Sequence, residues 1–381
     1  MRIGIDIRTL NPQSPTGIGK YIYSLLQHFV QLDGENTYDV YYPFRSNSSS
    51  WIRKNLGDSF AAHMGWVPEF LSAEKFNDLW LRRYLPARIK KDRIDVFHGP
   101  SYLLPEEGNV KRIVTIHDLS PVLFPSMYEG ITSNAIVRRT KNAVEQADAV
   151  IADSEHTRRD IIELYHTPPD KVRTIYLGID ERYSGPVEEG YVQEVREKYD
   201  LPEDFILHVG SYHPRKNTEV ILRALSNLRK RGKVVRLVLS GKKTRYFSRI
   251  QELVRDLQLE KFVKFMGYIP DEQVHALYSC AKALVYPSLY EGFCLPMIEA
   301  MASGLPCIVA NTACLPEVAG EAVILVDPNS PENIADAIIR VLENHEVREE
   351  LSKAGYERSK KFSWKKAASE TLDLYKEVAG Y

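Results

Sequence analysis

Short apolar runs alternate with amphipathic helical segments along the whole of this 381-residue chain. Parallel strands need crossover connections of a dozen or more residues, and these are usually helices. The alternation therefore predicts an α/β protein in which helices cover parallel sheets. Strands are expected at residues 2–7, 38–43, 96–98, 112–116, 149–152, 172–176, 205–209, 236–240, 263–265, 283–286, 306–309 and 322–326, and helices at 19–32, 75–90, 133–147, 156–165, 218–231 and 331–342.

The length of the chain predicts two domains, because a single hydrophobic core rarely serves more than about 250–300 residues. Each half carries a similar series of strands and helices, so two Rossmann-like domains are expected. The stretch 178–186, followed by the acidic run 187–190, is the expected linker, which gives a first domain over 1–182 and a second over 183–362. The last segment, 363–381, is expected to be a capped helix.

Composition and charge exclude several classes of protein. The 50 basic and 51 acidic side chains give a net charge of -1, whereas nucleic-acid-binding domains usually carry a large basic surplus. No apolar run has the length of a membrane span, and the first residues enter a strand without a signal peptide's apolar region. A cytoplasmic protein that binds no nucleic acid is therefore expected. The cysteines form no C-x-x-C pair, so neither a metal site nor a disulfide is expected from Cys280, Cys294, Cys307 and Cys314.

Two glutamates eight positions apart, Glu291 and Glu299, mark the most informative segment. They follow the apolar run 283–286, at a strand-to-helix junction of the kind where open α/β sheets bind ligands. Pro296 suits the first turn of the helix, which places Glu291 in the loop before it and Glu299 about one turn inside. The free N–H groups of a helix start, together with Gly292, allow close approach of a diphosphate.

Two other loops carry groups that suit an anionic ligand. Arg215 and Lys216 follow the strand that ends near Gly210, and a guanidinium beside an ammonium can neutralise phosphate oxygens. Gly17 and Gly19 follow the first strand and permit backbone approach to an anion, although an ordinary strand–helix turn explains them equally well.

His117 ends the apolar run 112–116 and is expected at the carboxyl edge of its sheet. A lone histidine is more often structural than functional, so its position alone does not decide its role. Asp118 either orients this imidazole or contacts a substrate. His98 ends another strand and is a weaker candidate.

The segment 287–320 resembles the E-x7-E donor-site signature of the retaining GT-B glycosyltransferases of family 4. This resemblance implies two facing Rossmann-like domains, the first for the acceptor and the second for the nucleotide-sugar donor, with the C-terminal helix crossing back to the first. It also implies transfer of a hexose to a glycan or lipid-linked saccharide acceptor without a metal or other cofactor. By the same resemblance, Glu291 and His117 are catalytic, Asp118 binds the acceptor, and the donor is bound by Gly17, Gly19, Gly210, Ser211, Arg215, Lys216, Tyr268, Ile269, Phe293, Cys294, Leu295 and Glu299.

Three segments, 5–8, 115–121 and 293–296, look most like those of bacterial mannosyltransferases of O-antigen and exopolysaccharide assembly. This similarity implies GDP-mannose as the donor, with a UDP-sugar carrying glucose, N-acetylglucosamine or galactose as the alternative. It also implies that the acceptor is lipid-linked, which would bring the protein to the inner membrane surface.

The segment 76–91 mixes aromatics, leucines and basic side chains at helical spacing. It fits a core-packed helix with a solvated basic face, or a helix that rests on an anionic membrane surface. Three other kinds of protein stay open: a nucleotide-sugar epimerase of the same fold, a two-lobed binding protein and a dehydrogenase. The binding protein would need export, and the dehydrogenase would need a third glycine where Ile22 stands.

Overall fold

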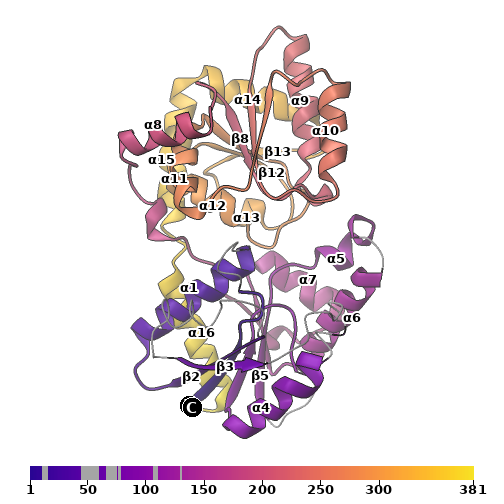
Figure 1. Ribbon diagram of the computed structural model, residues 1–381, viewed down its shortest axis with the longest axis vertical. Coiled ribbons are helices and arrows are strands. Elements are labelled where there is room, and N and C mark those ends of the chain that lie inside the picture. Colours follow the sequence, from indigo (N-terminus) through magenta and orange to yellow (C-terminus); the bar gives the residue numbers. More distant parts are fainter. Residues whose placement is uncertain (11–15, 44–59, 66–74, 76–78, 106–109, 129–130) are drawn as a thin grey trace. The chain divides into compact units, whose positions relative to one another are not determined.

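The computed structural model describes residues 1–10, 16–43, 60–65, 75, 79–105, 110–128 and 131–381 (Figure 1). The chain forms two compact units. Unit 1 comprises Met1–Gly178 and Trp364–Tyr381, and unit 2 comprises Ile179–Ser363. The boundaries expected from the sequence, 182/183 and 362/363, lie within a few residues of these positions.

Unit 1 is built on a parallel sheet with the strand order β3-β2-β1-β4-β5-β6-β7. The order reverses between β1 and β4, as in doubly wound α/β folds, where ligands bind outside the carboxyl ends of the strands. The strands are β1 (Arg2–Asp6), β2 (Thr37–Pro43), β3 (Phe60–Gly65), β4 (Val96–Gly99), β5 (Lys111–Ile116), β6 (Ala149–Ala152) and β7 (Val172–Thr174). The α-helices are α1 (Gly17–Leu32), α4 (Leu85–Asp92), α5 (Ser120–Leu123), α6 (Ile131–Gln146), α7 (Glu155–Tyr165) and α16 (Trp364–Ala379).

Unit 2 repeats this plan with the order β10-β9-β8-β11-β12-β13, which reverses between β8 and β11. The strands are β8 (Ile206–Val209), β9 (Leu237–Ser240), β10 (Val263–Gly267), β11 (Ala283–Tyr286), β12 (Cys307–Ala310) and β13 (Ile324–Val326). The α-helices are α8 (Glu189–Lys198), α9 (Thr218–Lys230), α10 (Phe247–Asp256), α11 (Asp271–Cys280), α12 (Leu295–Ala302), α13 (Leu315–Ala319), α14 (Pro331–Glu343) and α15 (His345–Ser359). The alternation of strands and helices therefore predicted the α/β class correctly.

One edge strand, β3, is not among the expected strands. Its sequence, Phe-Ala-Ala-His-Met-Gly, has low intrinsic preference for a strand. It forms because it pairs in register with β2, which places Phe60 opposite Tyr38 with their ring centroids 5.5 Å apart. The pairing of distant segments thus overrides local propensity here.

The C-terminal helix α16 belongs to unit 1, although it follows unit 2 in the sequence, and it packs beside α1 (Figure 1). Its Tyr375 is fully buried, and the hydroxyl lies 2.7 Å from Nδ1 of His98 on β4. The imidazole continues to Thr115 on β5 at 2.8 Å, and Thr115 meets Tyr21 on α1 at 2.9 Å. This chain of hydrogen bonds fastens the returning helix to the sheet, and it gives His98 a structural role.

The segment 76–91 is helical where the structure describes it, and it packs within unit 1. Residues 76–78 lie outside the described part of the chain. A π-helical turn, Trp80–Tyr84, leads into α4, and Arg93 ends it in the left-handed conformation. The large apolar side chains are buried in the core of unit 1, including Trp80, Leu85 and Ile89. They are not available to enter a membrane, so the core-packed interpretation is favoured.

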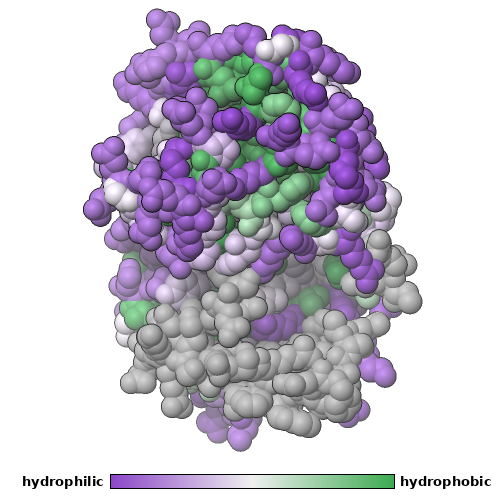
Figure 2. Space-filling view, turned by 45° about the horizontal axis from the view of Figure 1, so that its top comes forward, coloured by the Kyte–Doolittle hydropathy of each residue, from purple (hydrophilic) through white to green (hydrophobic). Residues whose placement is uncertain are grey.

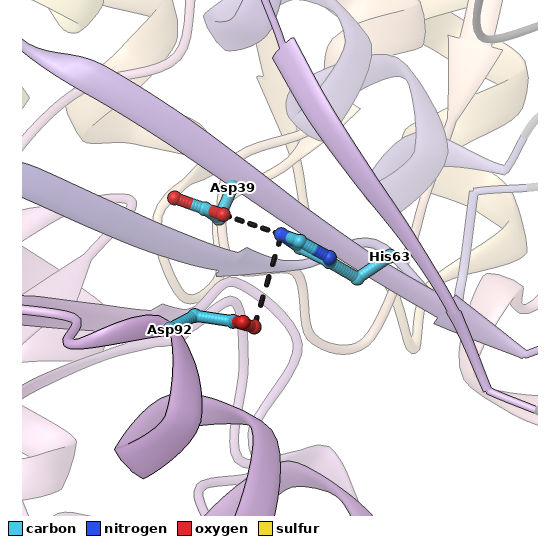
Figure 3. Close-up of side chains that lie close together, drawn as sticks. All are labelled: Asp39, His63 and Asp92. Carbon is cyan, nitrogen blue, oxygen red and sulfur yellow. Dashed lines mark hydrogen bonds and ion pairs between the residues drawn. The ribbon is translucent and has the colours of Figure 1, made fainter.

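The side chains of Asp39 on β2, His63 on β3 and Asp92 at the end of α4 point toward one another in a cluster whose atoms are close enough to hold a metal ion (Figure 3). The cluster is already balanced by two arginines. Arg2 Nε lies 2.6 Å from Asp39, and Arg88 lies 3.1 Å from Asp92 and 2.6 Å from Nδ1 of His63. Because a guanidinium only donates, Nδ1 accepts and Nε2 donates to Asp39. Two carboxylates thus face two cations, and the cluster ties β1, β2, β3 and α4 together.

None of the helices in the described part of the chain is long and apolar enough to cross a membrane. Where Figure 2 shows unit 2, hydrophilic side chains form the rim of the visible surface and apolar side chains appear toward its middle. Among the described residues of unit 2, the exposed large hydrophobic side chains are Val234, Tyr268 and Leu325.

Two buried histidines predict a loss of stability in mild acid. Burial lowers the pKa of His98 in unit 1 to about 3 and that of His208 in unit 2 to about 4, compared with an ordinary value of 6.5. Below pH 6.5 the unfolded chain binds protons that the folded protein does not. The free energy of unfolding should therefore fall toward pH 4, by up to about 1.4 kcal/mol per pH unit for each histidine.

Urea denaturation of the wild type and of His98→Gln at several pH values between about 5 and 7 tests this prediction. The variant is expected to lose stability less steeply on acidification, whatever its stability at neutral pH. An unchanged slope would contradict a neutral, buried His98.

Candidate active site

A buried carboxylate joins two loops at the reversal point of the sheet in unit 2. The loop after β11 carries Glu291, whose Oε2 lies 2.8 Å from Arg215 and whose Oε1 lies 2.7 Å from Lys216 in the loop after β8. Ser288 donates a further hydrogen bond of 2.6 Å to Oε1. Burial alone would raise the pKa of Glu291, but the charges of Arg215 and Lys216 hold it at about 2. The carboxylate is therefore ionised at neutral pH.

The two cations are held by further contacts from the β11 side. Lys216 Nζ donates to the hydroxyl of Tyr286 at 2.6 Å and lies 5.1 Å from the centre of that ring. Arg215 donates to the carbonyl of Tyr290 at 2.5 Å. Two cations and one carboxylate leave one net positive charge, with the side chains of Arg215 and Lys216 only 14% and 12% exposed. Such a site favours an anion.

The close approach of β8 and β9 positions the loop that carries these cations. At Gly241, a Cβ atom would lie 1.7 Å from the carbonyl oxygen of Gly210, so only glycine fits there. Tyr212 and Lys242 are then joined by a backbone hydrogen bond of 3.2 Å, which ties the loop 210–217 to the end of β9. Ser211, between Gly210 and Tyr212, is partly buried in this loop.

Glu299 lies one turn inside α12, as the spacing predicts, because the helix begins at Leu295 with Pro296 in its first turn. Its carboxylate is buried and accepts a hydrogen bond of 3.1 Å from Tyr278 on α11. Glu291, in the loop, and Glu299, inside the helix, are thus held by different groups. The pattern of two acids eight apart therefore places two differently supported carboxylates around one helix start.

Cys294, the residue that precedes α12, adopts the left-handed conformation, with φ 82° and ψ 68°. It is buried, and burial raises the pKa of its thiol, so the sulfur is protonated at neutral pH. A residue with a side chain in this conformation is uncommon, and such outliers cluster at functional sites. No feature of the sequence predicts this left-handed backbone at Cys294.

The other residues of unit 2 that the resemblance assigns to donor binding divide into exposed and buried side chains. Tyr268 follows the end of β10, is 41% exposed, and has the ammonium of Lys242 at 5.6 Å from its ring centre. Ile269 is buried, and Phe293 packs edge-on against Phe362 at 5.3 Å. The side chains of Ile269 and Phe293 therefore support their loops within unit 2.

In unit 1, His117 follows the end of β5, as expected, and both of its ring nitrogens are hydrogen-bonded. Nδ1 lies 2.7 Å from Oδ2 of Asp153, and Nε2 lies 2.9 Å from the carbonyl oxygen of Pro100. The sequence analysis missed Asp153. It directly follows the apolar run of β6, so the rule that parallel strands present ligand groups at their carboxyl ends points to it as well as to His117.

Asp118 faces a cavity of about 270 Å³ in unit 1. Its Oδ1 accepts hydrogen bonds from the backbone and hydroxyl of Ser120, at 2.9 and 2.6 Å. The other walls combine two aromatic rings, several aliphatic side chains and one cation. They include Tyr102, Leu103, Leu119, Val122, Tyr128, Ile136, Val137 and Arg139.

Gly17 and Gly19 open α1, as expected, next to residues 11–15, which lie outside the described part of the chain. Thr16 caps this helix, and its hydroxyl accepts the N–H of Gly19 at 3.1 Å. One of the free N–H groups of the helix start is therefore already used by the cap.

Comparison with known proteins agrees with this geometry. Residues 15–183 match the family described as Glycosyltransferase Family 4, and residues 192–358 match the one described as Glycosyl transferases group 1. The O-antigen chain mannosyltransferase B of Escherichia coli is 30% identical over 369 residues, which are 95% of this chain and 96% of that protein. The chain belongs to the family 4, group 1 glycosyltransferases.

Other relatives are similar over part of their length or in fold alone. The serotype-specific mannosyltransferase WbdA of Escherichia coli is 31% identical over 284 residues, and the match spans 72% of this chain but only 35% of WbdA. Sucrose-phosphate synthase from Thermosynechococcus elongatus has a TM-score of 0.79 at 22% identity, over 99% of both chains. HepE from Anabaena, solved with UDP and glucose, has a TM-score of 0.78 at 16% identity, over 99% of this chain and 100% of its own. These two structures confirm the GT-B fold.

Substitution of Cys294 separates backbone strain from packing. Glycine and alanine both remove the thiol, but only glycine relieves the left-handed conformation, which costs other residues roughly 1 kcal/mol. We expect Cys294→Gly to exceed Cys294→Ala in free energy of unfolding by about this amount, as measured by urea denaturation. An alanine variant at least as stable as the glycine variant would contradict strain at this position.

Proposed function

We propose that this glycosyltransferase moves mannose from GDP-mannose to a saccharide acceptor of a bacterial O-antigen or related polysaccharide, with retention of the anomeric configuration. The observation that carries the proposal is the buried Glu291 held between Arg215 and Lys216 at the reversal point of the sheet in unit 2. The names of two relatives at about 30% identity, both O-antigen or serotype-specific mannosyltransferases, support mannose as the sugar.

In this proposal the positive site of unit 2 holds the donor diphosphate. Arg215 and Lys216 contact its oxygens, and the free N–H groups at the start of α12 add the positive end of the helix dipole. Glu299 then binds the ribose hydroxyls, and the exposed Tyr268 lies beside the base. Charge from two side chains and a helix start replaces the divalent ion that a diphosphate otherwise needs, so the reaction requires no metal.

The charges of this site suit departure of the diphosphate. As the bond to the sugar breaks, positive charge develops on the sugar ring and negative charge on the leaving diphosphate. Arg215 and Lys216 stabilise the negative charge as preorganised groups. Glu291 carries no proton at neutral pH, so it cannot act as a general acid, and its fixed negative charge suits the sugar hydroxyls and the cationic ring instead.

The acceptor belongs, in this proposal, to unit 1. The cavity beside Asp118 combines the rings of Tyr102 and Tyr128 with the charges of Asp118 and Arg139. Aromatic faces together with planar charged groups suit a sugar ring, which has both apolar C–H faces and hydroxyls. A lipid-linked saccharide would bring the enzyme to the cytoplasmic face of the inner membrane, through its acceptor and not through the buried side chains of α4.

Thermal stabilisation by GDP, UDP, ADP and their mannose and glucose derivatives, with EDTA present, tests the donor. A ligand that binds only the folded protein adds about 2.7 kcal/mol at a hundred times its dissociation constant. We expect GDP and GDP-mannose to raise the Tm and the other nucleotides to raise it much less. Stabilisation by UDP-sugars alone would overturn the mannose proposal and leave the family intact.

The stereochemistry is tested on the product. Transfer from the α-linked donor should give an α-mannoside, which the one-bond C–H coupling of the anomeric carbon in NMR distinguishes from the β form. A β-mannoside would contradict retention.

A further inference from the structure

Both ring nitrogens of His117 are hydrogen-bonded to acceptors within unit 1. The carbonyl oxygen of Pro100, 2.9 Å from Nε2, can only accept, so Nε2 carries a proton. A second proton lies between Nδ1 and Oδ2 of Asp153, which are 2.7 Å apart. The pair is therefore either an imidazolium with a carboxylate or a neutral imidazole with a carboxylic acid.

The turn that presents the carbonyl of Pro100 has little freedom. A Cβ atom at Gly99 would lie 2.1 Å from the carbonyl oxygen of Leu103, so the backbone passes too closely for any other residue. Because the turn is fixed by this approach, it cannot easily move its carbonyl away from Nε2. The acceptor on the Nε2 side is thus built into the fold.

The groups around the imidazole favour the ion pair. Burial acts against both charges, since it would lower the pKa of His117 and it raises the pKa of Asp153. The attraction between the two charges and their hydrogen bond oppose burial, and with the charge of Asp118 they leave the pKa of His117 above its ordinary value. The geometry decides for the ion pair, because both ring nitrogens face acceptors, at 2.7 and 2.9 Å. The other groups that face the ring are uncharged at neutral pH. Tyr21 and Tyr102 meet it edge-on at 5.0 and 5.5 Å, and His98 stays neutral because its pKa is about 3.

Asp153 has a feature that stability alone does not explain. It is 2% exposed, and its Oδ1 has no hydrogen-bond partner among the described residues. An unsatisfied buried oxygen of this kind costs about 1–3 kcal/mol, and each such group in a folded protein calls for an explanation. Oδ2 of the carboxylate pairs with the imidazole of His117, while Oδ1 pairs with none of the described residues.

We propose that Asp153 is a positioning residue that keeps His117 permanently charged, so that His117 serves sugar transfer as a fixed cation. This inference rests on the proposed function for its role in transfer, but the charge state itself does not. With both ring nitrogens protonated, His117 has no lone pair and cannot remove the proton of the acceptor hydroxyl. Its contribution is a positive charge held in one place at the carboxyl edge of the sheet, because both N–H groups are already bound within unit 1.

Ring ¹⁵N NMR of histidine-labelled protein tests the charge state directly, with the His117 signal assigned from its absence in His117→Gln. We expect wild-type His117 to keep both ring protons between about pH 6 and 8, and Asp153→Asn to lower its pKa to about 6.5 or below. A matched control is Asp160→Asn, since Asp160 pairs with His156 at 3.5 Å on α7. It should leave the His117 signal unchanged. A wild-type His117 that is neutral at pH 7 would overturn the proposal, even if Asp153→Asn did not fold.

The pH profile of kcat tests the role in transfer. If only the charged imidazole works, a pKa near 6.5 leaves about 3% of Asp153→Asn active at pH 8, so its kcat should be about 30-fold below that of the wild type. The ratio of the two kcat values should recover as the pH falls toward 6. A loss that is the same at every pH would overturn the proposed role and indicate a purely structural one. An absence of nucleotide-sugar binding in the wild type would instead refute the proposed function, while the NMR result would stand.

Discussion

The ion pairs of Glu291 with Arg215 and Lys216 hold the functional edge of unit 2 together. They join the loop after β8 to the loop after β11, at the point where the strand order reverses. Each charge depends on the others, because removal of one partner leaves a buried ion without compensation. In the proposed function, the excess of one positive charge makes the site receptive to a diphosphate, and the ionised carboxylate of Glu291 lies beside that ligand.

Unit 1 also has a buried pair of interacting side chains at the carboxyl edge of its sheet. A carboxylate, Asp153, and an imidazole, His117, meet at neighbouring strand ends. A chain of hydrogen bonds through His98 also joins Tyr375 on the C-terminal helix α16 to Thr115 on β5. One histidine is charged by its acidic neighbours and the other is kept neutral by burial. The two histidine-bearing strand ends of unit 1 thus differ in charge because their partners differ.

The sequence predicted the fold class and the placement of Glu291 and Glu299 well, for a physical reason. Strands buried on both faces are continuous apolar runs, and a proline marks the first turn of α12. It could not predict which groups meet across the sheet. Lys216 reaches Glu291, 75 residues further along, only because β8 and β11 are neighbours. Asp153 was missed although it ends an apolar run, and the left-handed backbone of Cys294 and the pairing of β3 have no local signal.

Binding of GDP and of guanosine to the wild type and to Lys216→Ala, measured by titration calorimetry, tests the central claim that this cluster is the diphosphate site. The account predicts at least a tenfold loss of affinity for GDP, since charge-assisted hydrogen bonds contribute about 1.5–3 kcal/mol, with guanosine affinity changed by less than about twofold. An equal loss for both ligands, or no loss for GDP, would contradict a phosphate site at Lys216.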